Sequence, residues 1–392
     1  MKRFWPTFAI AFITLMSLIV MPVMKKSLLA KVMAQSALTK TQSVPSIPQS
    51  PTLSPRRFAA SPGLPNVVIL ATGGTIAGTG ATSTTTVGYQ AAKLPVDTLI
   101  SSVPELKNIA RVTGEQVLQI ASQDMTNEGL LKIAKRVNEI LAQPNTDGIV
   151  ITHGTDTLEE TAYFLNLTVK SRKPVVLVGA MRPATALSAD GPLNLYNAVA
   201  LAGSREAAAK GVFVALNDQI SAAREVMKTN TTSVNTFQSP DFGYLGYIEL
   251  GKPYFYRLPT RKHTVDTPFD ISKLTELPKV DIVYGYTSNS RALIDAAVAE
   301  HVKGIVYAGV GNGNFSVQVI PGVVEATRKG VVVVRSARTG AGRVARNAEM
   351  NDDKLGTVAA DNLNPQKARI LLMLALTVTN NPQAIQQMFY TY

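Results

Sequence analysis

The stretch Asn66-Val-Val-Ile-Leu-Ala-Thr-Gly-Gly-Thr-Ile-Ala-Gly78 decides the fold of this chain. Its apolar first half predicts a buried strand of a parallel sheet, and its second half is a turn of small residues. A second stretch, Asp147-Gly-Ile-Val-Ile-Thr-His-Gly-Thr-Asp-Thr157, repeats this plan and runs directly into a helix-forming segment. Ligands of open α/β sheets bind at the carboxyl ends of the strands. We therefore expect Thr75, Thr155 and Asp156 to meet in one crevice.

Beyond these two stretches, apolar runs and helix-forming segments continue to alternate along the chain. Strand, loop and helix in repeated succession predict an α/β fold with a doubly wound, mostly parallel sheet that carries helices on both faces. The expected strands are 67–71, 148–152, 174–178, 211–216, 280–284, 304–308 and 331–335, and the expected helices include 130–141, 193–202 and about 365–378.

A proline-rich segment divides the chain. The 392 residues are too many for one hydrophobic core, so we expect two folded domains. Around residues 251–278 the alternation stops and four prolines occur, which is typical of a connection between domains. We therefore expect a larger N-terminal α/β catalytic domain at 63–258, an interdomain connection at 259–279 and a smaller C-terminal α/β domain at 280–392.

The positive charge of the chain, +12 at neutral pH, is concentrated near its N-terminus. Residues 1–61 carry eight lysines and arginines and no acidic residue, so the rest of the chain carries only +4. The sequence after residue 61 has no basic stripe interleaved with aromatic residues. We therefore expect no nucleic-acid partner.

The N-terminus has the layout of an export signal. Met1-Lys-Arg3 precedes an apolar run that extends to Met24, and Val32-Met-Ala34 offers small residues for cleavage. We expect a signal peptide at residues 1–34 and a periplasmic or secreted protein. The apolar run is also long enough to span a bilayer, so an uncleaved anchor is the alternative, and we expect membrane contact only through this leader. Residues 35–62 are rich in Ser, Thr, Pro and Gln and predict a flexible linker.

The first threonine loop carries a candidate nucleophile. Gly73 and Gly74 precede Thr75, and glycines let a backbone come close to a ligand. In a simpler interpretation, Thr75 only caps the next helix. The loop lacks the G-x-G-x-x-G spacing of a dinucleotide site and a suitable acidic residue roughly 20 positions later, which argues against an NAD-dependent oxidoreductase.

The second threonine loop adds a carboxylate. Thr155 and Asp156 precede the expected helix, whereas Thr157 and Glu160 form a candidate capping box. A carboxylate at a strand tip is well placed to bind an α-ammonium group. A hydroxyl of ordinary acidity needs a base or a cation beside it before it can attack. Lys228 is the candidate, although lysines are more often solvated surface charges.

We expect neither a metal nor a cofactor. His153 is interpreted as a structural residue, and His263 and His301 lie in unrelated segments, so the histidines predict no metal cluster. The chain has no cysteine, which excludes disulfides and thiol nucleophiles.

Seven short motifs are distributed over the folded part of the chain. They are Ala71-Thr-Gly-Gly-Thr-Ile-Ala-Gly78, Thr152-His-Gly-Thr-Asp-Thr157, Gly179-Ala-Met-Arg-Pro183, Ser188-Ala-Asp-Gly191, Asn194-Leu-Tyr-Asn197, Lys228-Thr-Asn230 and Leu363-Asn-Pro-Gln-Lys-Ala-Arg369. With these motifs, residues 64–392 resemble the bacterial type II L-asparaginases and glutaminase-asparaginases. The two threonine motifs together are much more specific than either one alone.

The resemblance implies an amidohydrolase. Thr75 would attack the side-chain amide carbon of the substrate, release ammonia and form an acyl-enzyme that water then hydrolyses. Tyr89, on a mobile loop, would polarise this nucleophile. Thr155, Asp156 and Lys228 would form a second set that activates a hydroxyl or water.

The resemblance also implies how the substrate is bound. Asp156 would bind the α-ammonium group, Ser122 and Gln123 the α-carboxylate end. Backbone amides near Thr155 and Ala180 would supply an oxyanion hole.

The resemblance further implies active sites that are shared between subunits. Glu349 of a neighbouring subunit would lie beside the substrate ammonium. Ser288 or Asn289 is the candidate for the family's small polar residue from the C-terminal domain. Sites of this kind imply a homotetramer built from intimate dimers.

The leading hypothesis is an exported enzyme that converts L-asparagine to L-aspartate and ammonia. A glutaminase-asparaginase with comparable activity on L-glutamine is the nearest alternative, because one methylene gives only about 1–3 kcal/mol of discrimination. Gln123 occupies a position where glutaminase-leaning relatives often have glutamate, which weakly favours asparagine. An exported amino-acid-binding protein without catalysis is the alternative from another class, and it would need neither Thr75 nor Lys228.

Overall fold

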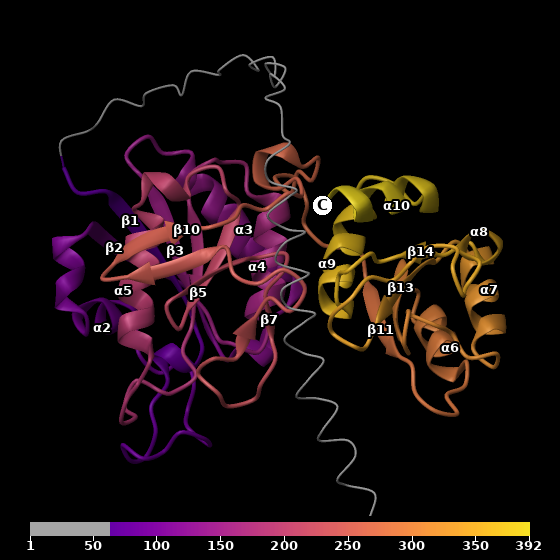
Figure 1. Cartoon of the computed structure of the whole chain (residues 1–392), viewed down its shortest axis with the longest axis horizontal. Coiled ribbons are helices and arrows are strands. Elements are labelled where there is room, and N and C mark those ends of the chain that lie inside the picture. Colours follow the sequence, from indigo (N-terminus) through magenta and orange to yellow (C-terminus); the bar gives the residue numbers. More distant parts are fainter. Residues whose placement is uncertain (1–62) are drawn as a thin grey trace, which may run out of the picture. The chain divides into compact units, whose positions relative to one another are not determined.

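The described part of the chain folds around two sheets of unequal size. The computed structural model describes residues 63–392, and the expected leader (1–34) and linker (35–62) lie outside the described residues. Figure 1 shows the larger sheet in the first part of the described chain and the smaller sheet in the last part. The expected α/β fold class is confirmed. No helix within residues 63–392 combines the length and the apolar character that crossing a membrane requires.

The larger sheet has eight strands in the order β10-β9-β6-β5-β4-β3-β1-β2. The strands from β2 to β5 in this order are parallel, whereas the three pairings that extend the sheet from β5 to β10 are antiparallel. Its strands are β1 Asn66–Gly73, β2 Arg111–Ile120, β3 Gly148–Thr152, β4 Val175–Val178, β5 Val212–Leu216, β6 Gln219–Ala222, β9 Gly246–Glu249 and β10 Lys252–Phe255. A separate two-stranded ladder consists of β7 Met227–Lys228 and β8 Phe237–Gln238.

The direction in which strands are added reverses at β1. From β1 the chain crosses to β2 on one side and then to β3 on the other side, after which β4 and β5 follow outward. Ala71 of β1 pairs with both Gln116 of β2 and Thr152 of β3. Doubly wound sheets bind their ligands in the crevice at such a reversal. The loops after β1 and β3, which contain Thr75 and Thr155, therefore flank this switch point.

Helices cover both faces of the larger sheet. Leu70 and Ile151 belong to a core with α3 and α4, whereas their neighbours Ile69 and Val150 belong to a core with α2 and α5. Buried parallel strands show this alternation because successive side chains point to opposite faces. The helices here are α2 Val96–Ser101, α3 Asn127–Leu141, α4 Leu158–Thr168 and α5 Gly191–Ala202, with the 3₁₀ turns η1 Thr75–Ala77, η2 Pro104–Asn108, η3 Ser122–Asp124 and η4 Arg205–Ala207.

The smaller sheet is parallel throughout, and its strands follow the order of the sequence, β11-β12-β13-β14. Helices α6 and α7 pack on one face and α9 packs on the other. The elements are β11 Val280–Tyr284, β12 Gly304–Gly309, β13 Val332–Ala337, β14 Val358–Ala359, α6 Ala292–Ala299, α7 Ile320–Arg328, α8 Asp352–Leu355, α9 Pro365–Ala375 and α10 Pro382–Thr391.

Helix α9 connects the two sheets. Leu371 of α9 and Phe164 of α4 belong to the same apolar core, and the two helices are in contact. At the start of α9, the side-chain oxygen of Asn364 accepts the backbone N–H of Lys367 and caps the helix. The N-terminus of α9 therefore lies near the helix that follows Thr155.

Two edge strands differ from the sequence-based expectation. The interruption expected around residues 251–278 is wrong for Lys252–Phe255, which form strand β10 at one edge of the larger sheet. Pro253 is tolerated there because an edge strand leaves part of its backbone unpaired. At the other edge, most side chains of β2 (Arg111–Ile120) are exposed or half-buried, so the strand lacks an apolar run. The connection at 259–279, which contains η5 Thr264–Asp266, stays a prediction.

Candidate active site

Two glycines allow the loops after β1 and β3 to touch. Gly74 has a φ angle of 80°, in the left-handed region that favours glycine. A Cβ atom on Gly74 would lie 2.2 Å from the Cα atom of Gly154, and a Cβ atom on Gly154 would lie 2.5 Å from Oγ of Ser122. Both distances are too short for any side chain, so the close approach depends on glycine. Thr75 and Thr155 each follow one of these glycines and are thereby brought together.

The hydroxyl of Thr75 meets the hydroxyl of Tyr89 at 2.6 Å, and either group can donate. Thr75 is 6% exposed and Tyr89 is half-buried. The loop that carries Tyr89 is closed at its base, where Thr79 and Gln90 exchange two backbone hydrogen bonds of 2.9 and 3.0 Å. In this position of the loop, the hydroxyl of Tyr89 is able to accept a hydrogen bond from Thr75.

Lys228 lies between the hydroxyl and the carboxylate of the second loop. Its Nζ atom donates to Oγ1 of Thr155 at 3.0 Å and to Oδ1 of Asp156 at 2.6 Å. Thr155 is buried, whereas 54% of the Asp156 side chain is exposed. A cation beside a hydroxyl favours its deprotonated form. The structure thus brings Thr155, Asp156 and Lys228 into direct contact, as the sequence led us to expect.

Ser122 connects the second loop to the turn η3. The backbone N–H of Asp156 donates to Oγ of Ser122 at 3.1 Å, and the hydroxyl of Thr157 donates to the carbonyl of Ser122 at 2.8 Å. The expected capping box of Thr157 and Glu160 is wrong, because Thr157 caps α4 without a side-chain hydrogen bond to the helix. Gln123, the next residue in η3, is exposed.

The end of β4 contacts the second loop. A Cβ atom on Gly179 would lie 3.1 Å from Cγ2 of Thr155, and the next residue, Ala180, is fully buried. The carboxylate of Asp190 accepts the backbone N–H of Met181 at 2.9 Å. This contact fixes the backbone around Ala180, where an oxyanion hole is expected.

His153 supports the second loop from inside. Its Nδ1 atom lies 2.7 Å from the carbonyl oxygen of Gly154, and its Nε2 atom lies 2.9 Å from Oγ1 of Thr161. Burial lowers the pKa of His153 to about 4, so the ring is neutral at neutral pH. These contacts agree with the structural role expected for His153. Among residues 63–392, no three metal-ligating side chains form a group.

The candidates from the last part of the chain lie apart from this cluster within one chain. Glu349 is exposed and its carboxylate accepts the side-chain amide of Asn314. Asn289 is buried in its own domain and donates to the hydroxyl of Tyr307 at 2.6 Å, while Ser288 is exposed with a φ angle of 61°. No hydrogen bond among residues 63–392 joins Ser288, Asn289 or Glu349 to the two threonines.

The sequence did not indicate two residues, Glu159 and Asn314, that contact the candidate site residues directly. Glu159 accepts the backbone N–H of Lys228 at 2.9 Å, and Asn314 contacts Glu349. Glu159 lies 69 residues from Lys228, so no local spacing indicates the contact. Glu159 is one of two adjacent glutamates in the first turn of α4, so its sequence position does not distinguish it from an ordinary helix-start carboxylate.

Comparisons with known proteins agree with this geometry. Residues 66–261 match the family described as "Asparaginase, N-terminal", and residues 279–389 match the "Glutaminase/Asparaginase C-terminal domain". "L-asparaginase 2" of Bacillus subtilis is 57% identical over 329 residues, which cover 84% of this chain and 87% of that protein. "Probable L-asparaginase periplasmic" of Haemophilus influenzae is 55% identical (83% and 93%), and "Glutaminase-asparaginase" of Pseudomonas fluorescens is 53% identical (84% and 91%).

Proposed function

The chain belongs to the glutaminase/asparaginase family, and on that premise we propose that it hydrolyses L-asparagine to L-aspartate and ammonia with Thr75 as the nucleophile. The contact that carries the proposal is the 2.6 Å pair of hydroxyls between Thr75 and Tyr89. It lies at a sheet switch point. The adjacent loop supplies the carboxylate Asp156, and strand β7 supplies the cation Lys228 that contacts it.

In the first step, Oγ1 of Thr75 attacks the amide carbon of the substrate side chain. The hydroxyl proton moves along the 2.6 Å contact to the phenolic oxygen of Tyr89, which gives up its own proton in exchange. The C–N bond then breaks, and the proton passes to the departing nitrogen as ammonia leaves. Proton transfer by a positioned group of this kind contributes about 10²- to 10⁴-fold. The product of the step is an ester between Thr75 and the aspartyl group.

In the second step, water hydrolyses this ester. We assign activation of the water to Thr155, whose hydroxyl lies 3.0 Å from Nζ of Lys228. Asp156 holds Lys228 in place from the other side of the ammonium group, at 2.6 Å. The step regenerates the hydroxyl of Thr75 and releases L-aspartate.

The remaining candidates orient the substrate. The exposed carboxylate of Asp156 binds the α-ammonium group, and the turn with Ser122 and Gln123 binds the α-carboxylate end. Backbone N–H groups near Thr155 and Ala180 stabilise the developing oxyanion. The contact of Gly179 with Thr155 supports this placement.

We also propose that neighbouring copies complete each site within a homotetramer. Glu349 carries an exposed carboxylate that contacts none of the two threonine loops of its own chain. A role for Glu349, and for Ser288 or Asn289, beside the substrate therefore requires a second copy. The exposed position of Glu349 supports this arrangement.

The proposal places the enzyme in the periplasm or outside the cell. The export-type leader at residues 1–34 and the printed name of the Haemophilus relative support this location. We further propose a linker at 35–62, an N-terminal domain at 63–258, a connection at 259–279 and a C-terminal domain at 280–392.

Ammonia release from the purified full-length chain, on L-asparagine and L-glutamine in parallel, tests the proposed function. We expect strong turnover of asparagine and weaker turnover of glutamine. Comparable rates would favour a glutaminase-asparaginase, which is the name of the Pseudomonas relative. Tight binding of asparagine without ammonia release would overturn the enzyme and favour an amino-acid-binding protein.

A further inference from the structure

A buried carboxylate connects the site to the last part of the chain, directly behind Lys228. Glu159 lies in the first turn of α4 and is 3% exposed. One of its oxygens accepts the backbone N–H of Lys228 at 2.9 Å. The other oxygen accepts the side-chain amides of Asn364 and Gln366 at the start of α9, at 3.1 and 2.9 Å. One side chain thus joins the helix that follows Thr155, the segment with Lys228 and helix α9.

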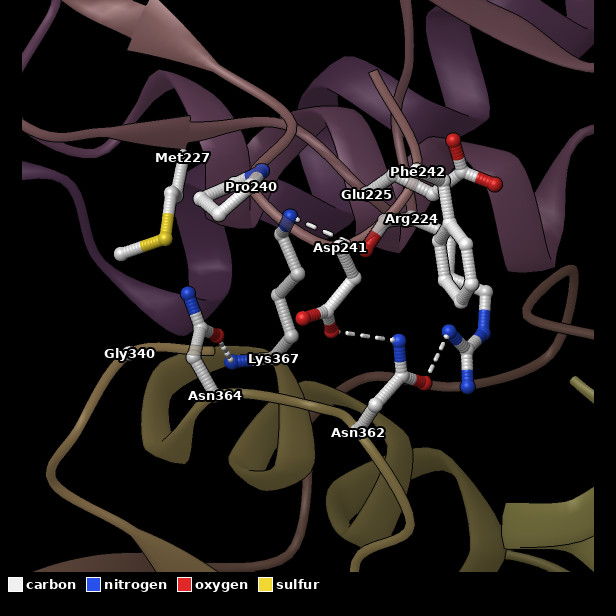
Figure 2. Close-up of a pocket in the computed structure, with 10 residues that line it drawn as sticks. All are labelled: Arg224, Glu225, Met227, Pro240, Asp241, Phe242, Gly340, Asn362, Asn364 and Lys367. Atoms are coloured by element: carbon white, nitrogen blue, oxygen red, sulfur yellow. Dashed lines mark hydrogen bonds between the residues drawn. The ribbon is translucent and has the colours of Figure 1, made fainter. Parts of the chain in front are cut away.

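Lys367 holds the same segment. It is 2% exposed, and its ammonium group donates to the backbone carbonyls of Arg224, at 3.1 Å, and of Val226. Figure 2 shows the side chain extending from helix α9 to the backbone that leads into Met227. Burial lowers the pKa of Lys367 to about 8, so keeping this ammonium inside the protein is costly. The two carbonyl contacts offset that cost.

Neither side chain is placed to react with the substrate. Both oxygens of Glu159 and the Nζ atom of Lys367 are buried and already bonded to protein groups. Lys228, by contrast, directs its own ammonium group to Thr155 and Asp156. Any effect of Glu159 and Lys367 on the reaction must therefore pass through the position of Lys228.

We propose that Glu159 and Lys367 are positioning residues for Lys228, an inference that rests on the function proposed above. Through them, helix α9 of the C-terminal part fixes the backbone that carries the cation of the active site in the same chain. A displacement of about 1 Å in such a group costs on the order of 100-fold in rate. The loss should appear mainly in kcat, because within residues 63–392 neither Glu159 nor Lys367 forms a hydrogen bond with Asp156, Ser122 or Gln123, the residues proposed to bind the substrate.

The first test compares Glu159→Gln with Glu160→Gln in the full chain. Glutamine has one acceptor oxygen, so it cannot serve the three donors that converge on Glu159. Glu160 is the next residue of the same helix, and its nearest cation is Arg369 at 3.9 Å, away from Lys228. We expect Glu159→Gln to lower kcat for asparagine by about 10- to 100-fold with KM changed less than about threefold, and Glu160→Gln to retain the wild-type values.

A double-mutant cycle identifies the residue through which Glu159 acts. If Glu159 works through Lys228, adding Glu159→Gln to Lys228→Met should cause no further loss of kcat. Losses that multiply would assign Glu159 to another task and overturn the proposal. Lys367→Met, which removes the ammonium at similar length, should lower kcat in the same way.

Two further results would decide against the proposal. A lower melting temperature for Glu159→Gln with an unchanged kcat would make the contact merely structural. If Glu159→Gln fails to fold, Gln366→Met, which removes one of the three donors, must still lower kcat severalfold, and an unchanged kcat would overturn the idea. A wild-type chain without ammonia release would instead reject the proposed function, and the positioning role would fall with it.

Discussion

The two threonine loops end neighbouring strands of one sheet, yet they are held in different ways. Thr75 shares its hydroxyl contact with Tyr89, which comes from a largely exposed loop. Thr155 belongs to a loop that is braced by buried His153 and Ser122, and its hydroxyl contacts Lys228. Loops that close over a substrate commonly complete a site only in the closed position. We therefore propose that the loop with Tyr89 completes the first site as a lid, whereas the contacts of the second loop lie within the folded part of the chain.

Thr75→Val removes the hydroxyl that we propose to be the nucleophile, at nearly constant volume, and should have the largest effect. We expect kcat for asparagine to fall by roughly 10⁴-fold or more, because the remaining groups cannot form the ester. The melting temperature should stay close to wild type. Turnover near the wild-type rate in this variant would remove Thr75 as nucleophile.

Lys228→Met tests the second threonine loop, which contains Thr155 and Asp156. It removes the cation beside Thr155 and leaves Asp156 without its 2.6 Å partner. We expect kcat to fall by about 10²- to 10⁴-fold, within the range of acid–base groups. Steady-state ammonia release measures the loss. Lys210→Met, a change of a half-buried lysine in another segment, serves as the matched control. Equal losses in both variants would contradict a special role for Lys228.

Tyr89→Phe tests the first threonine loop by removing a single hydroxyl group. The ring stays, but the hydroxyl that meets Thr75 is lost. We expect a fall in kcat of about 10²-fold, less than for Thr75→Val because the nucleophile itself remains. Rapid-quench measurement of the first turnover should show the defect before ester hydrolysis. A defect confined to the later hydrolysis would place Tyr89 with the second loop.

Glu349→Ala tests whether either loop needs a neighbouring copy. We expect KM for asparagine to rise about tenfold, equivalent to about 1.4 kcal/mol, while kcat and the oligomeric mass change little. Steady-state kinetics and light scattering measure these quantities. Unchanged kinetics would argue against a site shared between subunits.

Acidification should loosen the second loop. His153 has an ordinary pKa of about 6.5 that burial lowers to about 4. Between these values the unfolded chain binds the proton and the folded chain does not, so stability falls as the pH falls, by at most about 3 kcal/mol. Urea unfolding at neutral pH and near pH 4.5 should show a smaller loss in His153→Gln. Equal pH dependence in both proteins would contradict this role.

Much of the fold could be predicted because each buried strand leaves a short apolar run in the sequence. The expected strands 148–152 and 280–284 coincide with β3 and β11. Strand β2 could not be predicted because most of its side chains face solvent or are half-buried. The antiparallel extension by β10 was missed for a similar reason, since Pro253 is tolerated only by an edge position.

The placement of the two threonine loops could be predicted for the same local reason, whereas the contacts that support them could not. Thr75, Thr155 and Asp156 follow strands that the sequence reveals. Glu159, however, depends on Asn364 and Gln366, which lie 205 and 207 residues away. Thr157 also found its partner, the carbonyl of Ser122, outside its own helix. Contacts between segments that are far apart in the chain produce no recognisable residue spacing in the sequence.

The most direct test of the account is to find the threonine that carries the acyl group. Wild-type and Lys228→Met proteins would be mixed with L-asparagine, quenched in acid within the first turnover, digested and analysed by mass spectrometry. We expect an aspartyl ester on the peptide that contains Thr75, with more of it in Lys228→Met because hydrolysis is slowed. An ester on the peptide that contains Thr155, or ammonia released in the first turnover with no ester on either peptide, would contradict it.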